Sequence, residues 1–138
     1  MLEGQRVASL VFDLLKADTG AGGVNTLTSG RIYRDRVPQT AVLPAVTVTL
    51  VSATDVSTLG GVRVGTNVLV DVRVVNAGTV YSNAIADRID VVLQNTGGLK
   101  ETVRTVELVR EQVQAFIEDD AGTSFAHLIA TYRTPAYA

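Results

Sequence analysis

The residue best suited to acid–base chemistry is the single histidine of the chain, His127. An imidazole acts as a general base when a nucleophile and an orienting group lie within hydrogen-bond reach. The candidate hydroxyls belong to Ser52, Ser57, Ser82 and Ser124. None of them lies in a nucleophile elbow or another recognisable catalytic context. The alternation around His127 places it on one face of a predicted strand with Phe125 and Ile129, so we interpret it as a structural or interface residue.

Metal and phosphate sites find no better support in the residue pattern. Glu118 to Asp120 form the densest acidic run, which in a hairpin turn is more often a solvated tip than a cage for a hard cation. The chain has no cysteine, which excludes a thiolate site and a disulfide. The glycine pairs at 22–23, 60–61 and 97–98 do not open a helix with phosphate-binding spacing. We therefore predict no catalytic, metal or cofactor site.

A small basic cluster is the remaining candidate. Arg31, Arg34 and Arg36 flank Tyr33, an arrangement that in a larger basic groove would suit base stacking. Asp35 interrupts the cluster, however, and the formal net charge of the chain is −2, so no overall basic field exists for a nucleic-acid backbone. We interpret the arginines as decoration of an edge strand that forms ion pairs between subunits.

The composition limits the classes of protein that the chain can belong to. With 138 residues, 46% of them hydrophobic and 19% charged, it is expected to fold as a single domain over residues 1–138. Polar residues interrupt the apolar ones near the N-terminus, which argues against a signal peptide, and no run is long enough to span a bilayer. We expect a soluble chain without a membrane partner.

Hydrophobic periodicity predicts the elements that would position these side chains. Helical spacing covers residues 4–17 and 79–95, and residues 18–30 are expected to be a mobile loop. The predicted strands are a short edge strand at 31–37, a strand at 45–51, a long strand at 62–74, one bulged strand or two strands over 102–117, and a last strand at 124–133. Residues 52–61 are expected to be a hairpin connection.

These elements predict an α+β fold in the order α-β-β-β-α-β-β. The sheet is expected to be mostly antiparallel, with about four to five strands and two helices packed on one face.

The order of several short motifs gives the chain a family resemblance. Gly30–Tyr33 reads GRIY, Pro38 marks a crossing, Leu43–Pro44 opens the next strand, Gly60–Gly61 centres a long hairpin, and Ala84–Val92 forms the core of the second helix. In this order, over nearly the whole chain, the sequence resembles the tail-completion and tail-terminator proteins of long-tailed bacteriophages.

The resemblance implies a structural virion protein and not an enzyme. Such a protein would form a ring, expected to be a homohexamer, that caps the finished tail tube and presents a docking surface to the head connector. The implied partners are further copies of the chain, the tail tube protein and the connector or stopper protein, with no sequence-specific nucleic-acid binding. The implied location is the head-proximal end of the tail, after assembly in the host cytoplasm.

The predicted interface residues pair a basic set with an acidic set on a neighbouring subunit. They are Arg31, Tyr33, Arg34, Arg36 and Arg63, facing acids such as Asp71, Asp87 and Glu118. The loops at 18–30 and 52–61 are candidate contacts to the tube or the connector. Three alternatives stay open at this point: a head-closure or neck adaptor protein of the same virion, a tail tube protein, and a small α/β enzyme.

Overall fold

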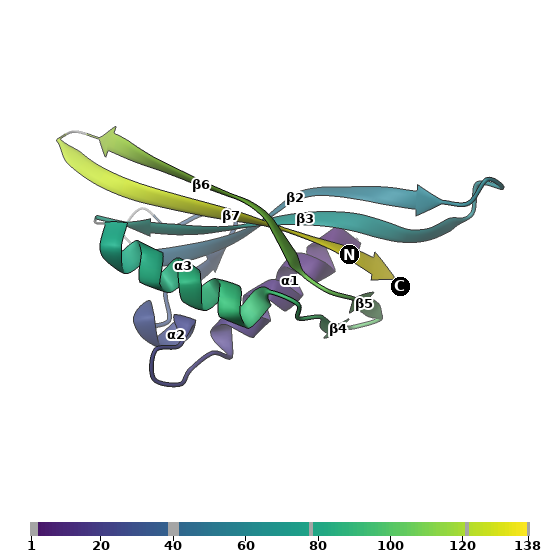
Figure 1. The fold of residues 1–138 in the computed structure, drawn as a ribbon, viewed down its shortest axis with the longest axis horizontal. Coiled ribbons are helices and arrows are strands. Elements are labelled where there is room, and N and C mark those ends of the chain that lie inside the picture. The colour runs from purple at the N-terminus through teal and green to yellow at the C-terminus, as the bar shows by residue number, and fades with distance from the viewer. Residues whose placement is uncertain (1–2, 39–41, 78, 121, 138) are drawn as a thin grey trace.

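Strands are the main type of element in the computed structural model, which describes residues 3–38, 42–77, 79–120 and 122–137. The strands form one curled sheet with helices packed against it (Figure 1). In chain order the elements are α1 (Glu3–Lys16), α2 (Val24–Leu27), β1 (Ile32–Arg34), β2 (Ala45–Ser57), β3 (Arg63–Asn76), α3 (Thr79–Leu93), β4 (Gly98–Lys100), β5 (Val103–Thr105), β6 (Val109–Asp120) and β7 (Thr123–Tyr137). None of the described helices is long and apolar enough to cross a membrane.

The sheet is built around the central pair of β3 and β7. Its order is β1-β2-β3-β7-β5-β4, and β6 shares with β5 the edge of β7 that faces away from β3. All neighbouring strands are antiparallel except β1, which runs parallel to β2. The β2–β3 and β6–β7 hairpins extend toward opposite ends of the molecule (Figure 1). They leave the body of the fold as two arms.

The hydrophobic core lies between the sheet and the helices α1 and α3. Alternate residues of β2 and β3 point toward the helices and are fully buried, as the period of two in a strand requires. The residues that they meet on the helices are Val7, Val11 and Leu15 of α1 and Ile85, Ile89 and Leu93 of α3, at the three-and-four spacing of one helical face. Tyr132 of β7 is also fully buried and its hydroxyl donates to Asp90 over 3.0 Å. Burial, and then the neighbouring carboxylate, raises the pKa of Tyr132.

The predicted fold class is wrong in its strand count, its helix arrangement and its order. The structure is mostly β, with 49% of residues in strands and 24% in helices, and its sheet is mixed and seven-stranded instead of antiparallel with four to five strands and two helices on one face. Three helices occur among the described residues. The extra strands β4 and β5 are 3 residues each, too short to show any periodicity in the sequence, and long-range pairing holds them in place.

Two predicted boundaries also change, and both changes lengthen the arms. Residues 52–57 belong to strand β2, although the sequence analysis assigned them to a hairpin connection. The segment predicted as one bulged strand or two strands over 102–117 divides into β5 and the longer β6, and β6 has an irregularity between Arg110 and Gln112. The first helix and the second long helix agree with the prediction to within two residues.

The segment predicted as a mobile loop contains the short helix α2 and is clamped to α3. Arg88 donates from Nε and Nη2 to the carboxylate of Asp18 over 2.8 and 2.7 Å, and the amide of Val24 donates to the same carboxylate over 2.8 Å. Val24 itself is fully buried. The hydrogen bonds from Arg88 hold the pKa of Asp18 below its usual value, against the opposing effect of burial. This clamp ties the α1–β1 connection to the body of the fold.

The clamp predicts a pH-dependent loss of stability in the variant Asp18→Asn. We expect the free energy of unfolding to fall by about 2 kcal/mol at neutral pH, because hydrogen bonds to a charged group are lost at a side chain that is only 12% exposed. Since the pKa of Asp18 is lowered from 3.8, the difference from wild type should be full above that pH and should vanish as the pH falls through the folded-state pKa. Urea denaturation at several pH values measures it.

The matched control is Asp87→Asn, which removes an exposed carboxylate from α3, the helix that carries Arg88. We expect it to leave the free energy of unfolding unchanged within about 0.5 kcal/mol. Equal effects of the two variants would contradict the clamp.

Candidate subunit interface

The face of the sheet that turns away from the helices carries most of its polar side chains. Successive residues of a strand point to opposite faces, and residues paired across a ladder share a face. The odd-numbered residues of β3 and β7 and their partners on β2 and β1 therefore share this helix-free face, and they include Tyr33, Thr47, Asp71, Arg73 and His127. Thr47 and His127 are nevertheless buried. The face is therefore a polar surface that is partly covered by its own side chains and by the segment after β1.

His127 is the centre of a contact that joins β6 to β7. Its Nε2 lies 2.9 Å from the carboxylate of Glu118, and its ring stacks on Phe116 with 4.6 Å between centroids and 7° between planes. The guanidinium of Arg73 lies 5.9 Å from the centre of the Phe116 ring. Nδ1 of His127 is buried and has no hydrogen-bond partner in the described part of the chain. The hydroxyl of Ser124 bonds to the carboxylate of Asp119 and not to the imidazole.

A polar cavity on the helix-free face brings together two of the predicted interface residues. It has a volume of about 340 Å³, and Arg36 and Asp71 both line it, together with Arg73 and His127. Asp71 accepts a hydrogen bond of 2.6 Å from Thr131. Glu118 lies next to this group through its contact with His127. Arg36 is exposed and makes no ion pair with another described residue, so it is available to a partner.

The other predicted basic residues are engaged elsewhere within the chain. Arg34 turns to the helix face, where it donates to Ser9 and Gln5 of α1 over 2.8 and 2.9 Å. Arg31 donates from Nε to the carbonyl of Pro44 over 3.0 Å.

Arg63 and Tyr33 complete this set. Arg63 forms ion pairs with Glu3 at 3.0 Å and Asp55 at 3.7 Å. Tyr33 is half-buried beside Thr47 on the helix-free face. The structure therefore separates the predicted set. Arg36 is exposed and makes no ion pair with a described residue, so it can form an ion pair with another subunit.

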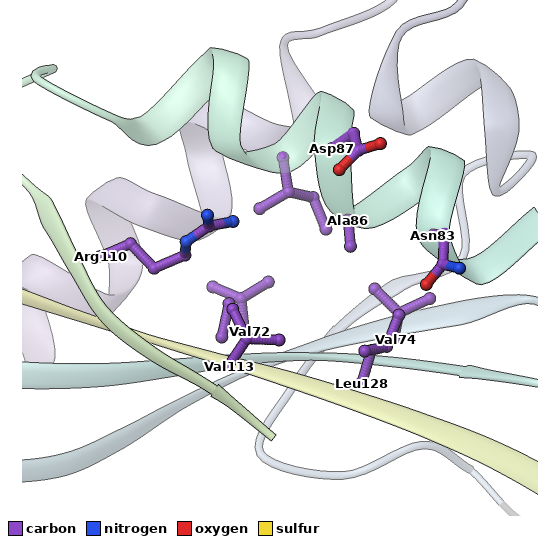
Figure 2. A pocket seen from close by; sticks show the side chains of 10 residues that line it. Val72, Val74, Asn83, Ala86, Asp87, Arg110, Val113 and Leu128 are labelled. Atoms are coloured by element: carbon purple, nitrogen blue, oxygen red, sulfur yellow. The ribbon is translucent and has the colours of Figure 1, made fainter. Parts of the chain in front are cut away.

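A second cavity lies on the helix side, between α3 and the strands β3, β6 and β7 (Figure 2). It also has a volume of about 340 Å³. Valine, leucine and alanine side chains form its floor, and Asn83 and Asp87 on α3 and Arg110 on β6 stand at its polar rim (Figure 2). Its lining suits an apolar side chain that has a polar neighbour.

The two arms expose apolar side chains on opposite parts of the molecule. On the β6–β7 arm these are Val113, Phe116 and Ile117, and on the β2–β3 arm they are Val51, Val56, Leu59, Val62 and Val64. Every residue of β6 from Val109 to Asp119 is exposed. Such an accumulation of exposed apolar residues on projecting strands is typical of surfaces that bind other proteins.

Sequence reasoning missed several of these features. It considered His127 and Glu118 separately. Their contact, and that of His127 with Phe116, depends on the register of the β6–β7 hairpin, which the sequence analysis did not assign. The signal that could have found the register is the turn at 119–123 followed by matched alternation on both sides. Among the described residues no cluster of histidine, aspartate and glutamate side chains could hold a metal ion.

Comparisons with known proteins give a family and a shared fold. The family model described as "Tail completion protein gp17" matches residues 9–134. A search of curated proteins finds no match. Among solved structures, a chain of the "Virion of native gene transfer agent (GTA) particle" has the same fold, with a TM-score of 0.73 and 20% sequence identity over 96% of this chain and 95% of that chain.

The His127 contact predicts how the β6–β7 arm responds to substitution. Replacing Phe116 by alanine removes the stacked ring and the contact with Arg73. We expect the free energy of unfolding to fall by about 1 kcal/mol more than the loss of buried apolar area alone would cause. Urea denaturation measures the difference. Ile117→Ala is the matched control, since Ile117 is the next residue, is 66% exposed and faces the other side of the sheet. If the two variants lose the same stability, the aromatic contact does not hold the arm.

Proposed function

The chain belongs to the family of tail completion proteins described as gp17, structural proteins of tail assembly, and from that premise we propose that it caps the finished tail tube as a ring. The ring is expected to be a homohexamer at the head-proximal end of the tail. Its partners would be further copies of the chain, the tail tube protein and the connector of the head. In this role the protein needs matched surfaces and carries out no catalysis.

The observation that carries the ring is the pair of unpaired sheet edges at the two flanks of one sheet. Among the described strands β6 pairs only with β7, and β1 covers the outer edge of β2 only at Val46–Val48. A contact between two different surfaces of identical subunits repeats from copy to copy and closes into a ring when the rotation allows. A contact of one surface with itself would stop at a dimer.

The polar groups of the chain support an assembly role for a second reason. The described side chains that could do chemistry bond to one another across strands: His127 to Glu118, Asp71 to Thr131, and Asp18 to Arg88. These pairs fix the register of the hairpins and the α1–β1 connection. Rigid hairpins present their exposed side chains in a fixed arrangement, which lowers the entropic cost of docking.

Removal of the gene separates the terminator role from that of a neck adaptor in the same virion. A tail that lacks its cap continues to grow, so we expect particles without this protein to have tails of irregular, extended length and no attached heads. Electron microscopy of the particles measures tail length. Tails of normal length without heads would contradict capping and favour the adaptor.

The free arginine gives a residue-level test of the ring. We expect Arg36→Glu to impair ring formation or tail joining by at least tenfold in assembled particles, because the substitution places a negative charge where an acid of the neighbouring subunit is expected. Sizing with light scattering, in the presence of tail tubes, measures assembly.

The control for this variant is Arg104→Glu, which makes the same charge change at an exposed position of β5. It should assemble like the wild type. Normal assembly of Arg36→Glu would remove Arg36 from the interface.

A further inference from the structure

The unpaired edge of β6 has the features of a strand that pairs with another chain. Proteins usually protect an exposed edge strand with charged residues, especially lysine, or with proline. Residues 112–117 contain none of these. All of these residues are exposed. Within the described chain β7 is the only strand that β6 meets. An edge of this length with free backbone donors and acceptors is a template for another strand.

The unpaired edge of β2 is the matching surface on the opposite flank of the same sheet. β1 ends at Arg34, opposite Val48, so residues 52–57 continue along the arm with β3 as the one described strand that pairs with them. This segment also lacks lysine and proline, and its single charge, Asp55, is bonded within the arm to Thr66 and Arg63. The two edge segments therefore have the same length, and both lack the lysine and proline residues that discourage pairing with another strand.

The directions of the strands favour a contact between these two edges. β6 is antiparallel to β7, β7 to β3, and β3 to β2, so β6 and β2 run in opposite directions. A second copy beside the first in the same orientation has its β2 antiparallel to β6. It must also be shifted along the strands, because Gln112 lies level with Thr49 of its own chain through the ladders, and the shift brings residues 52–57 of the second copy to residues 112–117. Antiparallel pairing needs no inversion of the second copy and forms well-aligned hydrogen bonds.

We propose that residues 112–117 of β6 pair with residues 52–57 of β2 in a second copy of the chain, so that the sheet continues from subunit to subunit. This inference rests on the ring of the proposed function and gives its subunit contact. For the helix-free faces of both copies to form one surface, paired residues must share a face. Gln114 and Phe116 lie on that face in β6, and Thr54 and Val56 lie on it in β2, which restricts the register to steps of two.

The charges beside the two segments agree with this arrangement. Beyond Ile117, β6 continues into Glu118 and Asp119, while the edge of β2 in the second copy continues toward the end of β1. The residue exposed there is Arg36, which has no ion pair in the described part of its own chain. The acidic end of the β6–β7 arm thus meets the free arginine of the neighbour. Opposite charges at the end of a ladder favour one orientation over its reverse.

Disulfide trapping tests the pairing directly, because the chain contains no cysteine. The variants are Gln114→Cys combined with Thr54→Cys, and Gln114→Cys combined with Val56→Cys. Residues directly opposite each other in an antiparallel ladder are about 4.5–5.5 Å apart at Cα, within the range of a disulfide. On mild oxidation of the assembled ring, at least one variant should give a ladder of covalent oligomers up to the full ring on a non-reducing gel.

The matched control is Gln114→Cys combined with Asp55→Cys, one residue along β2 and on the other face, which should give a ladder at least tenfold weaker. An equal ladder from this control, a dimer from Gln114→Cys alone, or intact rings that no pair cross-links would overturn the proposal while the ring itself stands. The mass of the untreated protein with tail tubes is measured first. Absence of any oligomer there would overturn both the ring and the pairing.

Discussion

The antiparallel pairing of β3 with β7 is the interaction on which the rest of the structure depends. It joins residues 66–76 to residues 126–136, which are distant in the sequence, and it divides the sheet into two flanks. β2 and β1 add to one side, and β6 and β5 add to the other. Both strands of the central pair are longer than the body of the fold needs, so each extends with its partner into an arm (Figure 1). The same ladder therefore supports the core and positions the two unpaired edges that would meet in a ring.

The two faces of this sheet have different tasks. On the helix side, valines from β2 and β3 meet α1 and α3, and the area that they bury stabilises the fold. On the other side, the buried side chains of Thr131 and His127 bond to the carboxylates of Asp71 and Glu118. Such bonds contribute modestly to stability but fix the register, since a slip by one residue would expose the core and separate every pair. The fixed register is what allows two edges of separate copies to match.

The parts of the fold that local periodicity specifies were predictable from the sequence, and the parts that distant pairing specifies were not. The helix at 3–16 and the strong alternation of β3 were found because each repeats its signal over many residues. β4 and β5 are 3 residues each and depend on partners far along the chain, so the sheet was predicted too small. The short edge strand at 31–37 was predicted, but its parallel pairing with β2 was not. At the candidate interface the sequence analysis proposed a set of arginines; of these, Arg34 and Arg63 bond to side chains within the chain, whereas Arg36 makes no ion pair in the described residues. Only the direction of each side chain decides that difference.

The central claim is that the unpaired edges of β6 and β2 become paired when the protein assembles. Amide hydrogen exchange, compared between the free chain and the ring assembled on tail tubes, tests this claim most directly, since ladder formation protects backbone amides without any substitution. The account predicts that residues 112–117 and 52–57 both become strongly protected on assembly, while the core of β3 and β7 changes little. Unchanged exchange at both segments in a fully formed ring would contradict it.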